Sequence, residues 1–144
     1  MRVVLDAFAL IAALAGEPAA PEVETELRTG GCAITAVNLA EVIDQLVRAA
    51  KRPKYEVEAA LASLAAGGLL VVSVDEATAW IAGELRAAYY KRSTTPISMA
   101  DCFALAACRS SGASLATADG TLAHIARREG ITVLALPNST GIRP

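Results

Sequence analysis

The first sixteen residues, MRVVLDAFALIAALAG, constrain the fold more than any other stretch of the chain. From Val3 to Ala15 every side chain is apolar except that of Asp6. Val3–Leu5 is typical of a buried strand, and Ala7–Ala15 of a helix packed close behind it. A carboxylate where such a strand stops is normally paired, used as a helix cap or bound to a metal ion, because stripping water from an unpaired charge is costly. The rest of the sequence must therefore supply a charged partner, a helix to cap or further metal ligands for Asp6.

Length and composition exclude several classes of protein. The 144 residues fit one domain, so we expect residues 1–144 to form a single domain. No apolar run approaches the roughly 20 residues that cross a bilayer, and no signal peptide is indicated, so we expect a cytoplasmic protein with no membrane segment. The three cysteines lack Cys-x-x-Cys spacing and are expected in the core. A net charge of −2 argues against a generic basic nucleic-acid binder, but not against an enzyme that holds RNA locally.

Strand-like and helix-like segments alternate along the chain. Further strands are predicted at Cys32–Thr35, Leu69–Val74, Ser114–Thr117 and Thr132–Leu136. Further helices are predicted at Glu22–Thr29, Asn38–Ala50, Pro53–Ala66, Met99–Arg109 and Gly120–Arg128, with one more, capped by Asp75, that carries Trp80, Leu85 and Tyr89 on its apolar side. This alternation predicts an α/β fold with a parallel sheet covered on both faces.

Four acidic residues are candidates for a common site. Asp6 and Asp119 each follow a predicted strand, and functional groups of open α/β sheets gather beyond the carboxyl ends of the strands. Asp101 is the only charged residue in the apolar helix ISMADCFALAAC, which predicts a buried helix. Glu41, in TAVNLAEV, completes the set if its helix leans across the strand ends, because on a helical wheel it falls opposite the apolar stripe.

Each acid also has a purely structural interpretation. Asp6 and Asp119 are suited to cap helices, Ser98-x-x-Asp101 resembles a capping box, and Asn38 is placed to cap a helix with Glu41 three residues on. Taken together, however, three or four carboxylates at one sheet edge repel one another unless a cation compensates. Such oxygen ligands suit Mg²⁺, which activates water and polarises phosphodiesters. The single histidine, His124, is read as structural, since no nucleophile motif accompanies it.

The chain resembles a PIN domain, and specifically the VapC toxins of bacterial type II toxin–antitoxin pairs. The resemblance covers nearly the whole chain through VVLDAFALIA, TAVNLAEV, ISMADCFALAA and LATADGTLAHIA, in that order. It implies a PIN-like three-layer α/β/α fold with a mostly parallel central sheet of four or five strands. It also implies an acidic pocket whose metal ligands are Asp6, Asp101, Asp119 and Glu41, with the Thr117 hydroxyl orienting Asp119 or a metal-bound water. The sequence departs from many relatives at Phe8, where they carry serine or threonine.

What the resemblance implies is a Mg²⁺-dependent endoribonuclease, in which Mn²⁺ can substitute. Its partners would be a cognate VapB-type antitoxin, an RNA substrate and a second copy in a homodimer. The Ala/Leu-rich helix after Asp6 is suited to offer an apolar groove to a partner helix. We hypothesise that Lys91 and Arg92, in the segment KRSTTP, hold RNA phosphates.

Other functions stay open at this point. A PIN nuclease of RNA processing without an antitoxin has the same sequence features, and a non-catalytic α/β interaction domain is a further alternative. A signalling receiver domain is disfavoured because Asp6 has no acidic neighbour. A D-x-D phosphatase is disfavoured by Phe8, and a nucleotide-binding module by the lack of a glycine-rich phosphate loop.

Overall fold

The sheet has five strands, and all of them are parallel. In the computed structural model, which describes all residues 1–144, they pair in the order β3-β2-β1-β4-β5. Their bounds are Val3–Leu5 (β1), Cys32–Thr35 (β2), Leu70–Val72 (β3), Ser114–Thr117 (β4) and Val133–Ala135 (β5). The predicted parallel α/β fold is confirmed, with three of the strand ranges, β1, β2 and β4, matched residue for residue.

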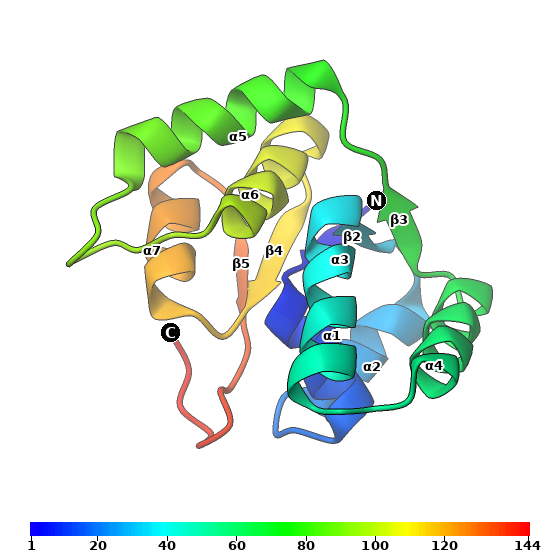
Figure 1. Cartoon of the computed structure of the whole chain (residues 1–144). Helices are drawn as coiled ribbons and strands as arrows, with labels where there is room; N and C mark the ends of the chain where they lie inside the picture. The colour runs from blue at the N-terminus through cyan, green and yellow to red at the C-terminus, as the bar shows by residue number, and fades with distance from the viewer.

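Helices cover both faces of this sheet (Figure 1). Helices α1 and α2 pack together below one face, α6 and α7 lie on the other, and α5 packs across the outside of α6. Helix α3 contacts both α1 and α6. The bounds are Ala7–Ala15 (α1), Ala20–Thr29 (α2), Ala36–Asp44 (α3), Lys54–Ala66 (α4), Glu76–Tyr89 (α5), Met99–Ser111 (α6) and Gly120–Arg128 (α7), with a π-helical turn, η1, at Gln45–Ala49.

Alternating side chains of β1 divide the interior into two hydrophobic cores. Val3 and Leu5 point into the core beneath α1 and α2, and Val4 points into the core beneath α6. All three side chains are buried, as a central strand covered on both faces requires. The three cysteines are also buried and free, which confirms their prediction as core residues.

The order of the strands creates a switch point between β1 and β4. From β1 the chain adds β2 and then β3 on one side, whereas β4 and β5 are added on the other side. In open α/β sheets, ligands bind beyond the carboxyl ends of the strands at such a point. Asp6 directly follows β1 and Asp119 comes two residues after β4, so the sheet places both at this position.

Two local predictions are wrong. The third helix begins at Ala36 and is capped by the Thr35 hydroxyl, which accepts a hydrogen bond from the backbone N–H of Asn38 at 3.1 Å, so Asn38 is not the cap. Trp80 does not face the core, because 67% of its surface is exposed. Leu85 is buried as predicted.

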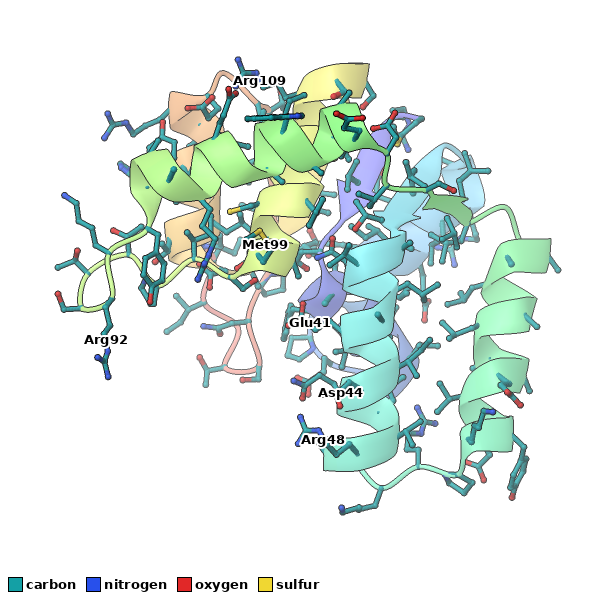
Figure 2. The ribbon with its side chains drawn as sticks, turned by 45° about the horizontal axis from the view of Figure 1, so that its top comes forward. Glu41, Asp44, Arg48, Arg92, Met99 and Arg109 are labelled. Carbon is teal, nitrogen blue, oxygen red and sulfur yellow. The ribbon has the colours of Figure 1, made fainter.

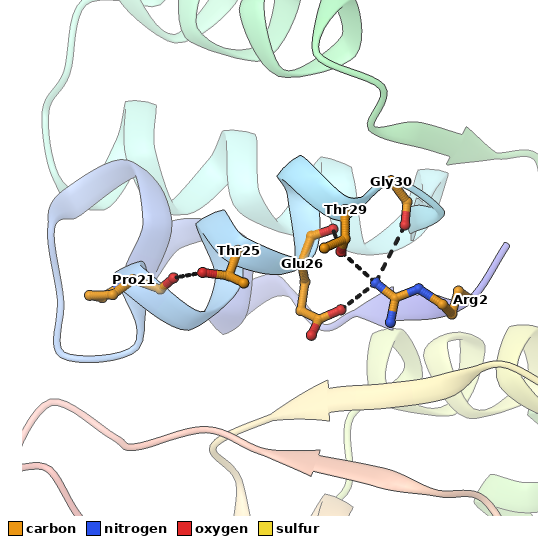
Figure 3. Close-up of polar contacts among 6 residues, drawn as sticks. All are labelled: Arg2, Pro21, Thr25, Glu26, Thr29 and Gly30. Carbon is orange, nitrogen blue, oxygen red and sulfur yellow. Dashed lines mark hydrogen bonds and ion pairs between the residues drawn. The ribbon is translucent and has the colours of Figure 1, made fainter.

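Arg2 fastens the start of β1 to the end of α2 (Figure 3). Its guanidinium donates to the Glu26 carboxylate at 2.5 Å and to the Thr29 hydroxyl at 2.7 Å. The two segments approach closely at Gly31, where a Cβ would lie 3.1 Å from the Cβ of Arg2 and where φ is +81°. Glycine is therefore required at this crossing. None of the helices combines the length and the apolar character that spanning a bilayer requires.

Candidate carboxylate site

Three aspartates lie at the starts of three helices, and each accepts a hydrogen bond from the main chain. Asp6 Oδ1 accepts from the N–H of Ala9 at 2.7 Å at the start of α1, and Asp119 Oδ1 accepts from the N–H of Leu122 at 2.8 Å at the start of α7. Asp101 Oδ2 accepts from the N–H of Ser98 at 2.9 Å, which completes a capping box on α6. The capping roles considered from the sequence are thus real.

The three aspartates also converge. Asp101 and Asp119 line the same small pocket, of about 40 Å³, together with Pro96 and Ile97. The negative charges of both raise the pKa of Asp6. Acids that lie far apart in the sequence are therefore near enough, at the switch point between β1 and β4, for their charges to act on one another.

Asp6 is the most strongly perturbed of these groups. Burial is the largest cause that raises its pKa, from 3.8 to about 7, and the charges of Asp101 and Asp119 add to the increase. Hydrogen bonds from the Thr117 side chain and the backbone of Ala9 lower it in part. Burial likewise raises the pKa of Asp101, against the lowering effect of Ser98, and the charge of Asp119 raises it further.

Thr117 links two of the acids. It is fully buried at the end of β4, and its Oγ1 accepts a hydrogen bond from the backbone N–H of Asp119 at 3.0 Å. The same hydroxyl stabilises the Asp6 carboxylate. A hydroxyl can accept one hydrogen bond while it donates another. The Thr117 side chain can therefore hold the main chain at Asp119 and also lower the pKa of Asp6.

Glu41 lies at the rim of the site rather than in the small pocket. Burial raises its pKa first, followed by the charges of Asp101 and Asp44, so α3 does lean toward α6. Figure 2 shows Glu41, Asp44 and Arg48 along one side of α3 and η1. Glu41 and Phe8 together line a groove of about 810 Å³ between α1 and the α3–η1 segment.

Positive charge is missing around these acids. Burial and the charges of neighbouring acids raise the pKa values of Asp6, Glu41 and Asp101, and no lysine or arginine contributes to any of the three. By contrast, Arg48 lowers the pKa of Asp44 through an ion pair at 2.7 Å. The site therefore concentrates negative charge that no basic side chain compensates.

The donor set fits a hard divalent ion. Every candidate ligand is a carboxylate, and oxygen ligands are those that Mg²⁺ and Mn²⁺ take in proteins. The main-chain hydrogen bonds of Asp6, Asp101 and Asp119 each engage one carboxylate oxygen. No three acidic, thiol or imidazole side chains lie together in an arrangement that could already hold a metal ion.

Sequence reasoning considered Asn38 only as a helix cap and did not predict that it is buried. Asn38, in the first turn of α3, is fully buried, and its Oδ1 accepts a hydrogen bond from the Thr35 hydroxyl at 2.5 Å. Its Nδ2 has no hydrogen-bond partner. Its burial could have been predicted from its position, because Asn38 stands in an otherwise apolar stretch at the start of a helix, three residues before Glu41. His124 is exposed on α7 and takes no part in the site.

Replacing Asp6 with asparagine should stabilise the metal-free protein in a pH-dependent way. A carboxyl whose folded pKa is raised to about 7 costs stability as the pH rises from its unfolded value toward 7 and above. In EDTA we expect Asp6→Asn to gain on the order of 2 to 4 kcal/mol at pH 8 and almost nothing at pH 4, since asparagine keeps the cap.

Urea unfolding at the two pH values measures this gain. The matched control is Asp75→Asn, which removes an exposed cap carboxylate whose pKa is lowered by its hydrogen bonds to Thr78. That variant should lose a little stability at pH 8 instead of gaining it. If Asp6→Asn and the natural chain were equally stable at pH 8, the ionised Asp6 carboxylate would not destabilise the folded protein.

The fold is found in several solved structures. FitAcB from Neisseria gonorrhoeae superposes with a TM-score of 0.63 at 21% identity, over 91% of this chain and 95% of that one. VapBC2 from Rickettsia felis, solved with a DNA fragment from its promoter, gives 0.64 at 17% identity, over 92% and 97%. VapC20 from Mycobacterium tuberculosis, described as a toxin that cleaves the sarcin-ricin loop, gives 0.66 at 17% identity, over 85% and 93%.

Two comparisons at the level of the sequence give different results. No functionally curated protein shows significant sequence similarity to the chain. A family model described as "PIN domain" matches residues 3–128, a range that includes all four candidate acids and Thr117. The chain therefore belongs to the PIN domain family.

Proposed function

We propose that the chain is a Mg²⁺-dependent endoribonuclease and the toxin of a VapC-type toxin–antitoxin pair. The observation that carries this proposal is the uncompensated cluster of acids at the switch point, where no basic side chain offsets the raised pKa values of Asp6, Glu41 and Asp101. A site of this kind is suited to bind a cation. The membership in the PIN domain family and the toxins among proteins of the same fold support nuclease chemistry.

Asp6 and Asp101 are the residues that would hold the ion, together with Asp119 and Glu41. When bound, Mg²⁺ or Mn²⁺ would supply an acidified water and a Lewis acid for the phosphodiester. The chain's own contribution is orientation: the helix caps fix three carboxylates, and Thr117 fixes the main chain at Asp119. Phe8, in place of a hydroxyl residue, leaves this side of the site apolar.

The loop from Lys91 to Pro96 is suited to hold RNA beside the acids. It is closed by backbone hydrogen bonds between Lys91 and Thr95, and its end, at Pro96 and Ile97, lines the pocket of Asp101 and Asp119. Figure 2 shows Arg92 at the outer tip of the loop, directed away from the protein. The loop would therefore bring phosphate-binding charge to the edge of an acidic centre.

The groove between α1 and η1 is the surface on which we place the antitoxin. Eight of its twelve lining residues are hydrophobic, among them Ile11, Leu14 and Leu46, and Glu41 lies in its wall. An apolar partner helix in this groove would bury its own hydrophobic face and cover Glu41 at the same time. A toxin–antitoxin complex from Klebsiella pneumoniae, which has the same fold, supports a partner of this kind. We further propose a cytoplasmic homodimer.

An alternative is a PIN nuclease of RNA processing that has no antitoxin. The acidic site and the basic loop serve both functions equally, and the apolar groove favours the toxin. A non-catalytic interaction domain is less well supported, because it gives no reason for the uncompensated acids.

Asp6→Asn and Asp101→Asn should each reduce Mg²⁺-dependent cleavage of RNA at least about 100-fold, because each removes a charged metal ligand. They should also abolish the increase in melting temperature that millimolar Mg²⁺ gives the natural chain. The control is Asp44→Asn, three residues from Glu41 and paired with Arg48, which should retain both. Unchanged cleavage in both variants, or undiminished cleavage in EDTA, would contradict the proposed chemistry.

The double change Lys91→Ala and Arg92→Ala should weaken RNA binding and flatten its salt dependence. Two lost phosphate contacts lower the slope of log affinity against log salt by roughly 1.4 for single-stranded RNA. Binding can be measured with the cleavage-deficient Asp101→Asn background. A second double variant, Arg28→Ala with Lys54→Ala, removes two exposed charges from α2 and α4 and should leave the slope unchanged. An intact slope in the first variant rules out the loop.

Expression of the chain alone should arrest growth, and co-expression of the gene encoded immediately upstream should relieve the arrest. Mapping of RNA ends in arrested cells would then give the cleavage site, with Asp101→Asn as the inactive control. Growth without arrest, combined with Mg²⁺-dependent cleavage of RNA in vitro, would favour the RNA-processing alternative.

A further inference from the structure

An exposed aromatic surface lies where α5 ends and α6 begins. Tyr90 directly follows α5 and leaves 42% of its surface exposed, and Met99, in the first turn of α6, leaves 44% exposed. Both line a space of about 300 Å³, the Tyr90 hollow, whose remaining walls are Gly83, Arg86 and Ala87 of α5. Its volume is at the lower end of the range for small-ligand pockets, so it suits one planar group better than a helix.

Arg86 holds the aromatic wall of the Tyr90 hollow in place. Its guanidinium Cζ lies 4.3 Å from the centroid of the Tyr90 ring, which is a cation–π contact. Its Nε donates a hydrogen bond to the carbonyl oxygen of Ile97 at 3.3 Å. Because Arg86 makes both contacts, the Tyr90 ring is oriented before any ligand arrives. A ring oriented in advance loses little conformational freedom when a planar group stacks on it.

The Tyr90 hollow adjoins the acidic site through two residues. Ile97, whose carbonyl group Arg86 binds, is buried and lines the small pocket of Asp101 and Asp119. Met99 stands in the same first turn of α6 as Asp101. When the phosphodiester of an RNA strand lies at the acids, a nearby nucleotide of the same strand is therefore within reach of the hollow.

The charge around the Tyr90 hollow is suited to RNA. None of its five lining residues is acidic, Arg86 is one of them, and Lys91 and Arg92 directly follow Tyr90 in the chain. Figure 2 shows Met99 and Arg92 on the same side of the molecule. Basic groups for phosphates beside an aromatic ring for a base are the combination with which proteins bind single-stranded nucleic acids.

We propose that the Tyr90 hollow is a subsite for one unpaired RNA base, which stacks on Tyr90 while Lys91 and Arg92 hold the adjoining phosphates. The inference rests on the proposed function and deepens it, because it names the form of RNA that the site takes. A strand with a base free to leave the stack near the cleaved bond fits the hollow, whereas a duplex keeps its bases paired and stacked. Tyr90 is then a specificity-determining residue outside the acidic centre.

Removal of the Tyr90 ring should weaken RNA binding without changing its salt dependence. In the cleavage-deficient Asp101→Asn chain without Mg²⁺, Tyr90→Ala should bind an unstructured RNA of about ten nucleotides roughly 5- to 100-fold more weakly, the range for one lost base–aromatic stack. The slope of log affinity against log salt should stay the same, because no phosphate contact is lost. Tyr90→Trp, which keeps a stacking surface, should bind like the parent.

The matched control is Tyr55→Ala, which removes a tyrosine that is 70% exposed on α4 and lines neither the hollow nor the small pocket of the acids. It should leave RNA affinity unchanged. A second control is the same RNA annealed to its complement, whose binding should not respond to Tyr90→Ala. Circular dichroism melts check that all variants are folded.

Removing single bases from the RNA tests the stacking partner directly. An abasic nucleotide keeps its phosphate, so a scan of abasic positions isolates the contribution of each base. At one position the abasic RNA should bind the parent about as weakly as the intact RNA binds Tyr90→Ala. Combining that abasic position with Tyr90→Ala should cost nothing further, because both changes remove the same contact.

Four results would overturn the proposal. If Tyr90→Ala binds RNA as tightly as the parent while the Lys91 and Arg92 double variant binds more weakly, no base enters the hollow and the proposed function stands. The same holds if every abasic position weakens Tyr90→Ala as much as the parent. A Tyr90→Ala chain whose mass in sedimentation changes, but whose RNA affinity does not, would assign the hollow to a protein contact. If the parent binds no RNA, the subsite and the proposed function fail together.

Discussion

The parallel pairing of β1 with both β2 and β4 is the constraint on which the site depends. It aligns the carboxyl ends of the strands, so the residues that follow them emerge at one edge of the sheet. Asp6, Thr35 and Thr117 all come from this edge, and each is buried. Because β1 is covered on both faces, a shift of one residue in its register would exchange Val4 with its neighbours between the two cores. The packing of the sheet interior and the position of the acids are therefore fixed together.

The structural and the functional interpretations of the acids turned out to be compatible. Asp6 and Asp119 cap helices and Asp101 completes the capping box of a third, and these positions also bring the three acids near one another. Capping engages one oxygen of each carboxylate with a main-chain N–H, and it limits how far the side chain can swing. The cap thus positions a candidate ligand. Holding the acids in these positions disfavours their ionised forms. Burial and mutual repulsion together raise the pKa values of Asp6 and Asp101.

The sequence predicts the strands, the helices and the helix-start positions of Asp6, Asp101 and Asp119, because buried strands and solitary acids leave a clear local pattern. It was insufficient where the outcome depends on packing between segments. Trp80 was assigned to the core from its apolar character, although its position on α5 faces outward. The contact between α3 and α6 that brings Glu41 toward Asp101 has no local signal either. The π-helical turn at Gln45–Ala49 was predicted as an ordinary helix, since periodicity does not register one extra residue in a turn.

The caps have an electrostatic consequence beyond positioning. Each helix carries a partial positive charge of about half a unit at its N-terminus, and α1, α6 and α7 all direct that end at the same acids. Three such macrodipoles offset part of the repulsion among the carboxylates, although the chain supplies no lysine or arginine there. The backbone thereby acts as a diffuse counterion that helps the acids to lie near one another without a basic side chain.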